Sequence, residues 1–116
     1  MNLWPEVRAI DPTFADTDSV ALRLYVPAEL DFFEGHFPGL PVVPGVVQLH
    51  WAAHFAREHL GTACKASRID QLKFLAIVVP ETELTLQLRL DRAAGLVHFA
   101  YTNASRTFSS GRISIE

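Results

Sequence analysis

The sequence has one cysteine and no long apolar run, and both shortages narrow the class of protein. A single cysteine, Cys64, excludes an internal disulfide and a cysteine-pair zinc site, which suits a reducing compartment. We expect Cys64 to be a small buried residue. The N-terminus lacks the basic and apolar regions of a signal peptide, and no apolar run reaches the roughly 18 residues of a membrane span. These features predict a cytoplasmic protein without membrane insertion.

Positive charge is also scarce. Lys and Arg number 10 against 13 Asp and Glu, for a net charge of -3, and the cations are scattered. Without a basic stripe, binding to a phosphate backbone has little electrostatic support, so we expect no nucleic-acid partner. The sequence contains no internal repeat, no low-complexity segment and no linker, which predicts a single domain over residues 1–116.

Alternating apolar and polar residues predict strands over much of the chain. Apolar side chains at every second position predict a half-buried strand over 20–26, which stops at Pro27. Turn signals at Pro80, Ala94-Gly95 and Asn103 separate the later segments. The later strands are expected at 67–74, 83–91, 96–102 and 107–115.

Residues 46–60 predict the one helix. They contain no Gly or Pro, and Gly61 follows as a usual helix stop. Apolar residues cover most of the helix circumference, so something must wrap the helix. One buried helix followed by an antiparallel meander predicts an α+β fold in which a curved sheet wraps a central helix.

The stretch EGHFPGLPVVPGVVQLH, residues 34–50, contains three prolines and three glycines before and at the predicted helix start. Pro44 suits a first helical turn, and Gly45 allows another group to approach the backbone. A helix start has unpaired N–H groups and a partial positive charge, which suit a carbonyl that becomes enolate-like. Gly45 and Val46 are the expected donors.

His36 lies just before the prolines, which restrict the backbone and can hold its imidazole in one place. Because the ordinary pKa of an imidazole is about 6.5, such a side chain is a candidate general base at neutral pH. The alternative is that the loop is only a tight connection and His36 is a solvated or structural residue.

Residues 35–46, GHFPGLPVVPGV, resemble the GHFPGxPxxPGV signature of the hotdog-fold 3-hydroxyacyl-(acyl-carrier-protein) dehydratases, the FabA/FabZ-like family. Residues 69–80 resemble the strand that follows in that family, with its Lys-Phe pair and a later Pro. The resemblance implies a long helix wrapped by an antiparallel sheet and at least a dimer with active sites between subunits. It also implies a carrier-protein-bound 3-hydroxyacyl substrate, a trans-2-enoyl product and no cofactor.

The resemblance also implies residue roles. The histidine of GHFP, here His36, removes the Cα proton, and the glycine of the later PG pair, here Gly45, donates its N–H to the thioester carbonyl. The family's third participant is a helix Asp or Glu of the partner subunit that assists departure of the hydroxyl group. Here that position, fourteen residues after His36, is His50.

His50 leaves several hypotheses open. A protonated His50 would donate a proton to the leaving hydroxyl, although the positive helix end opposes that charge. A neutral His50 would hydrogen-bond the hydroxyl or a water while His36 shuttles the proton. This role does not require His50 to have a raised pKa. Alternatively, the chain has lost dehydration and serves as a thioesterase, an acyl-chain binder or a partner subunit.

The residues around His50 add two expectations. Gln48-Leu49-His50-Trp51 looks like the branch associated with aryl-polyene and other specialised acyl-chain pathways, the ApeI-like branch. We expect Trp51 and Phe55 to be packing residues of the core or a dimer. His50 and His54 have the spacing of metal ligands on a helix, but with no third ligand evident we predict no metal site.

Overall fold

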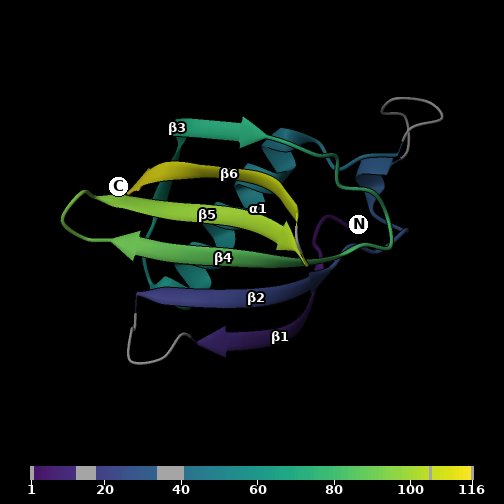
Figure 1. Ribbon diagram of the computed structural model, residues 1–116, viewed down its shortest axis with the longest axis horizontal. Helices are drawn as coiled ribbons and strands as arrows, with labels where there is room; N and C mark the ends of the chain where they lie inside the picture. The colour runs from purple at the N-terminus through teal and green to yellow at the C-terminus, as the bar shows by residue number, and fades with distance from the viewer. Residues whose placement is uncertain (1, 13–17, 34–40, 105, 116) are drawn as a thin grey trace.

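The computed structural model describes residues 2–12, 18–33, 41–104 and 106–115. Within these ranges, one helix, α1 (Gly45–Leu60), and one short 3-10 helix, η1 (Asp31–Phe33), accompany six strands (Figure 1). The strands are β1 (Glu6–Pro12), β2 (Ser19–Tyr25), β3 (Cys64–Phe74), β4 (Glu83–Asp91), β5 (Leu96–Asn103) and β6 (Arg106–Ile115). Among the described residues, no helix is long and apolar enough to span a membrane.

The six strands form one antiparallel sheet in the order β1-β2-β4-β5-β6-β3. Strand β3 directly follows α1 in the chain, yet it lies at the far edge of the sheet, beside β6 (Figure 1). The sheet curves over one side of α1, which lies behind it in Figure 1. The predicted α+β fold, a sheet wrapped over a central helix, is therefore confirmed.

Strict alternation along the central strands explains how the core forms. In β4, the leucines at 84, 86, 88 and 90 are buried and the residues between them are half-buried or exposed. Strands β2 and β5 repeat this pattern opposite β4, so one face of the sheet is apolar. Burying that face against α1 removes apolar surface from water, which is the main force holding the helix to the sheet.

Helix α1 contributes one stripe to this core, at the spacing of an amphipathic helix. Its buried residues are Val47, Gln48, Trp51, Ala52, Phe55 and Ala56. The predicted packing role of Trp51 and Phe55 is confirmed as a core role, and the Trp51 indole also donates a hydrogen bond to the Leu3 carbonyl at 2.9 Å. The helix face with Val46, His50 and Arg57 stays exposed. The sheet of the same chain therefore covers less of the helix than we expected from the apolar residues around its circumference.

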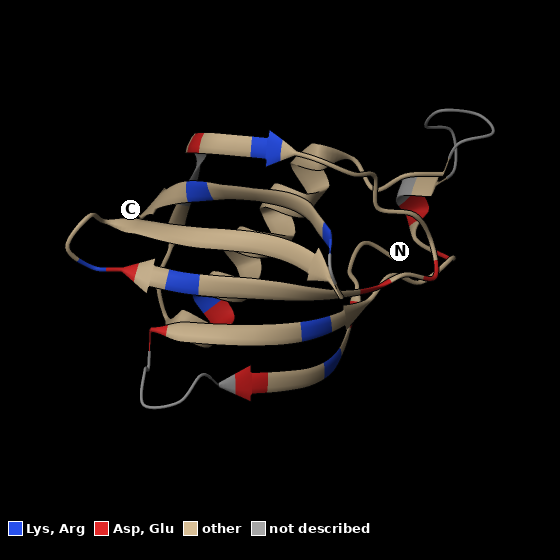
Figure 2. Ribbon diagram, in the orientation of Figure 1, with Lys and Arg blue, Asp and Glu red and all other residues tan. Residues whose placement is uncertain are grey.

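The predicted element bounds agree closely with the structure. The helix expected over 46–60 is confirmed, and Gly61 ends it in the left-handed conformation with φ 68°, its N–H bonded to the Arg57 carbonyl. The strand at 83–91 has the predicted bounds, and β3 begins three residues earlier than expected. Strand β1 was not predicted. Figure 2 shows cationic and acidic residues scattered over the strands and loops, without a basic stripe.

The core packing predicts a clear contrast between two neighbouring residues of β4. Leu86 is fully buried, whereas Gln87 is exposed on the opposite face of the sheet. We expect Leu86→Ala to lower the free energy of unfolding by about 2–5 kcal/mol, because it leaves a cavity. Gln87→Ala should change it by less than about 0.5 kcal/mol. Urea denaturation of both variants measures this, and equal effects would contradict the packing described.

Candidate active site at the start of helix α1

The chain enters α1 through an extended segment whose backbone is fixed by tertiary contacts. The Val43 N–H donates to the Val78 carbonyl at 2.8 Å. Pro44 follows with φ -59° and ψ 148°, so the helix begins only at Gly45. Proline has no N–H and a restricted φ, which makes it compatible with this abrupt start.

The first turn of α1 leaves two backbone donors open. The Pro44 carbonyl accepts from the N–H groups of Val47 and Gln48, at 3.0 and 3.2 Å. No described residue accepts a hydrogen bond from the N–H of Gly45 or Val46. Both amides lie at the positive end of the helix dipole, so this position can stabilise negative charge on a ligand oxygen.

Gly45 is in close contact with the aromatic ring of Phe74, at the end of β3. A Cβ added to Gly45 would lie only 2.5 Å from the Phe74 ring atom Cζ. Glycine is therefore required for the ring to lie against the helix start, and the ring itself remains half exposed. Phe74, the second residue of the Lys-Phe pair noted in the sequence, thus places an aromatic ring beside the two open amides.

His50 lies one turn after Val46, on the same exposed face of α1. It lines a hollow of about 310 Å³ together with Trp4, His54, Arg57 and the half-buried Cys64, among others. No carboxylate pairs with His50 among the described residues. Cys64, expected to be buried, is only partly so.

His54 is occupied by other contacts. Its ring centroid lies 4.4 Å from that of Trp4, and its Nε2 lies 3.8 Å from a carboxylate oxygen of Glu58. In the part of the chain that the structure describes, no three His, Cys, Asp or Glu side chains are grouped as metal ligands. His36 lies outside the described residues, so the structure does not place the predicted base relative to Gly45, Val46 or His50.

A buried polar network supports the first turn of α1. Gln48 donates from Nε2 to the Val43 carbonyl at 3.2 Å and accepts at Oε1 from the Ser109 hydroxyl at 2.7 Å. The Tyr101 hydroxyl donates to the Gln48 backbone carbonyl at 2.5 Å. Burial raises the pKa of Tyr101 well above its ordinary value, so the phenol stays protonated and remains a donor. Neither Ser109 nor Tyr101 was predicted, although Gln48 stood out in the sequence.

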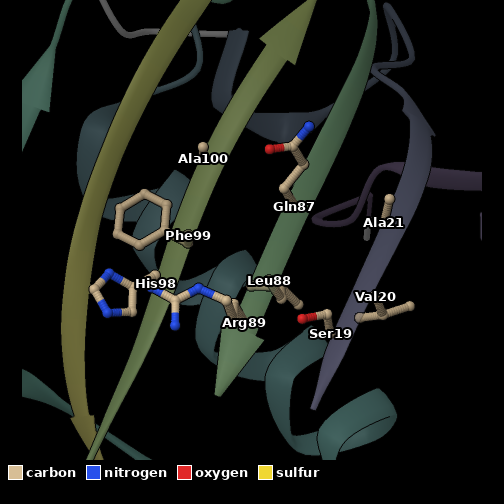
Figure 3. A pocket seen from close by; sticks show the side chains of 9 residues that line it. All are labelled: Ser19, Val20, Ala21, Gln87, Leu88, Arg89, His98, Phe99 and Ala100. Atoms are coloured by element: carbon tan, nitrogen blue, oxygen red, sulfur yellow. The ribbon is translucent and has the colours of Figure 1, made fainter. Parts of the chain in front are cut away.

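A second hollow, of about 370 Å³, lies on the outer face of the sheet, away from α1 (Figure 3). Ser19 from β2, Arg89 from β4 and His98 from β5 line it, and it contains none of the predicted site residues. Burial lowers the pKa of His98, and the positive charge of Arg89 lowers it further. This hollow includes neither Gly45, Val46 nor His50 among its lining residues, so it is separate from the helix start.

One helix held against a six-stranded antiparallel sheet, among the described residues, is the architecture of a hotdog fold. Residues 13–112 match the ApeI-like family, described as ApeI dehydratase. Because the match spans most of the sequence, the chain belongs to this family, and the resemblance found in the sequence is confirmed.

The chain is also similar to curated FabZ dehydratases. The 3-hydroxyacyl-(acyl-carrier-protein) dehydratase FabZ of Chloroflexus aggregans is 35% identical over 74 residues, covering 58% of this chain and 51% of that protein. FabZ of Pelotomaculum thermopropionicum is 33% identical over 79 residues, covering 62% of this chain and 56% of that protein. The chain thus spans about half the length of the curated relatives it matches.

Solved structures match over nearly the whole length. The dehydratase heterocomplex ApeI:P from Xenorhabdus doucetiae contains a chain with a TM-score of 0.84 and 29% identity, covering 97% of both chains. A protein from Erwinia carotovora subsp. atroseptica has a TM-score of 0.84 and 32% identity, covering 97% of this chain and 96% of that one. These matches support the hotdog fold over the full sheet and helix.

The contact between Gly45 and Phe74 predicts a coupled pair of substitutions. Gly45→Ala alone should lower the free energy of unfolding by up to about 1 kcal/mol, because the new methyl group displaces the half-exposed Phe74 ring. In a Phe74→Ala background the same change should be neutral or stabilising by up to about 1 kcal/mol, since alanine favours the helix. A double-mutant cycle by chemical denaturation measures the coupling, and purely additive effects would refute the contact.

Proposed function

We propose that this chain removes water from a 3-hydroxyacyl thioester and forms the trans-2-enoyl thioester. The observation that carries the proposal is the pair of amides at Gly45 and Val46, which have no acceptor among the described residues and follow the GHFP histidine by nine and ten positions. Two N–H groups at a helix start match the charge that develops on a thioester oxygen when the neighbouring carbon loses its proton.

In the proposed reaction, a nitrogen of the His36 imidazole takes the proton from Cα, and the C–H electrons move toward the carbonyl. The carbonyl oxygen gains negative charge, which the Gly45 amide stabilises, with Val46 as the second donor. The electrons then return to form the Cα–Cβ double bond while the Cβ–O bond breaks. The departing hydroxyl takes a proton and leaves as water, so protons and charge balance without a cofactor.

We assign His50 the role of a polar helper that hydrogen-bonds the departing hydroxyl or its water. Its neutral imidazole offers one donor and one acceptor, so His36 can return the proton it removed. His50 lies four positions after Val46, about 6 Å along the helix. This face is left open by the chain's own sheet, which supports an active site completed by a second subunit.

The proposed substrate is a 3-hydroxyacyl chain carried by an acyl carrier protein. The names of the FabZ relatives support the carrier, and membership of the ApeI-like family supports an acyl chain of the aryl-polyene type. The cytoplasmic location expected from the sequence stays a prediction.

A homodimer is the proposed assembly. Exposed apolar side chains gather where β3 ends and α1 begins, and we call this group the apolar rim. Its members are Val46, Phe74, Leu75, Ile77 and Val79. The bond from Val43 to Val78 and the contact of Gly45 with Phe74 hold the rim beside the helix start. Exposed apolar patches rimmed by polar residues are typical of subunit interfaces, and β3 is also an edge strand.

The second candidate function is that of a non-catalytic or partner subunit, favoured by His50 in place of the family's carboxylate. The Xenorhabdus doucetiae neighbour is part of a dehydratase heterocomplex, ApeI:P, which makes an unlike partner a concrete alternative for this chain as well. An acyl thioesterase is the remaining alternative from the sequence.

The activity is tested with a 3-hydroxyacyl-carrier-protein substrate, following enoyl formation and thiol release in the same assay. We expect enoyl product from the wild-type chain. His36→Ala should lower kcat by at least about 100-fold, as for loss of a general base. His50→Ala should lower it by about 10-fold or more, because a hydrogen bond to the leaving group is lost.

His98→Ala is the matched control, since His98 lies on the outer sheet face and should leave kcat unchanged. Thiol release without enoyl formation would establish a thioesterase. Neither product from the purified chain would favour the partner-subunit alternative, and full activity of His36→Ala would refute the assigned base.

The homodimer is tested by light scattering on the purified chain, whose monomer mass is 12.9 kDa. We expect twice that mass for the wild type. Ile77→Glu, in the apolar rim, should shift the equilibrium toward monomer because it buries an unpaired charge in the interface. Ile10→Glu is the control, because Ile10 is similarly exposed but lies on β1 at the other sheet edge. A wild-type monomer, or equal effects of both variants, would contradict the proposed interface.

A further inference from the structure

Gln48 is a buried polar side chain on a helix face that is otherwise apolar. Only 3% of its surface is exposed, and its neighbours in the core stripe are Val47, Trp51 and Ala52. A buried amide is costly unless its donor and acceptor are both bonded. Both ends of the Gln48 amide have partners, at Val43 and Ser109, and no buried side-chain polar atom of the described residues is left unsatisfied. The Gln48 side chain is therefore held in this apolar stripe by two specific hydrogen bonds.

The chemistry of the partners fixes the orientation of this amide. The Val43 carbonyl can only accept, so the NH₂ group of Gln48 must face it. Oε1 then faces Ser109, whose hydroxyl must donate. Ser109 is fully buried in β6, 61 residues away in sequence, so the sheet holds the Gln48 side chain in the orientation that reaches Val43.

Without its bond to Gln48, the Val43 carbonyl could accept a hydrogen bond from an N–H group in the first turn of α1. In a helix continued backward by regular geometry, this carbonyl would accept from the Val47 N–H, and a tighter turn would bring it to Val46. Instead Val47 bonds to the Pro44 carbonyl, and the Val43 carbonyl is bonded to Gln48. With the Val43 N–H bonded to Val78, both backbone groups of this residue are fixed.

We infer that Gln48 is a positioning residue that holds the Val43 carbonyl away from the start of α1 and so keeps the Val46 amide, beside that of Gly45, open for the substrate carbonyl. The inference rests on the proposed dehydration. Gln48 touches no reacting atom. It acts through Val43, and Ser109 acts through Gln48.

The sharpest test is Gln48→Glu, because its outcome depends on pH. A protonated carboxyl in this place donates to Val43 and accepts from Ser109, as the amide does, whereas an ionised carboxylate cannot donate. Burial raises the pKa of such a carboxyl above its ordinary value of about 4.3, which brings the change toward the assay range. We expect the ratio of variant to wild-type kcat to fall by at least about 10-fold between about pH 5.5 and pH 8.5.

Gln48→Leu removes the donor at every pH and should lower kcat by about 10- to 100-fold with little change in KM, because the open amides act mainly in the transition state. Tyr101→Phe is the matched control. It removes a buried hydrogen bond to the backbone of the same residue, and the phenylalanine ring keeps the packing. Its melting temperature should fall as in the other variants, with kcat within about twofold of wild type and a constant ratio across pH.

Amide resonances in ¹H–¹⁵N spectra provide a readout that needs no activity. Those of Gly45 and Val46 should move in Gln48→Leu and stay in place in Tyr101→Phe. Loss of kcat in Gln48→Leu, with a flat pH ratio for Gln48→Glu and unmoved amides, would overturn the inference, as would equal kinetic effects in Gln48→Leu and Tyr101→Phe. A wild-type chain without dehydratase activity would defeat the proposed function instead, and the amide shifts would then decide the inference alone.

Discussion

The burial of the α1 stripe against the curved sheet is the constraint on which the rest of the structure depends. The described residues contain one long helix, and the apolar face of the sheet has no other large partner among them. Apolar packing alone would allow the helix to slide along its axis, since it is not directional. Directional hydrogen bonds remove that freedom: Ser109 bonds to Gln48, and Val78 bonds to Val43.

Apolar packing and directional hydrogen bonds together explain why the helix start is both rigid and open. The sheet fixes the helix by apolar burial, and the Gln48 side chain bonds to the Val43 carbonyl, which would otherwise approach the Val46 N–H. The result is a pre-formed pair of donors that needs no rearrangement when charge develops on a ligand oxygen. The opposite face of α1, with His50, is left exposed by the chain's own sheet, and in the proposed assembly a second subunit covers it.

Local patterns predicted the elements of this fold well. The clean alternation of residues 83–91 predicted β4 with its bounds, and Gly61 predicted the end of α1. Strand β1 was missed because it is an edge strand with a register shift between Val7 and Ala9, which blurs the period of two that reveals a strand.

The helix start could be predicted in part. Pro44 and Gly45 indicated in the sequence where the helix starts and where its open N–H donors lie, because proline and glycine determine the local backbone conformation. The contact of Phe74 with Gly45 and the bond of Ser109 to Gln48 join residues far apart in sequence, and no local pattern encodes them. The relation of His36 to the helix start stays a prediction from the sequence.

The central claim is that the Gly45 and Val46 amides receive the substrate carbonyl. The most direct measurement is a ¹H–¹⁵N titration of the labelled chain with a 3-hydroxyacyl pantetheine analogue in which an amide replaces the thioester. The account predicts that both amide protons move downfield with one common saturation curve. Binding that leaves them in place and instead perturbs Ser19, Arg89 and His98 around the outer hollow would contradict it.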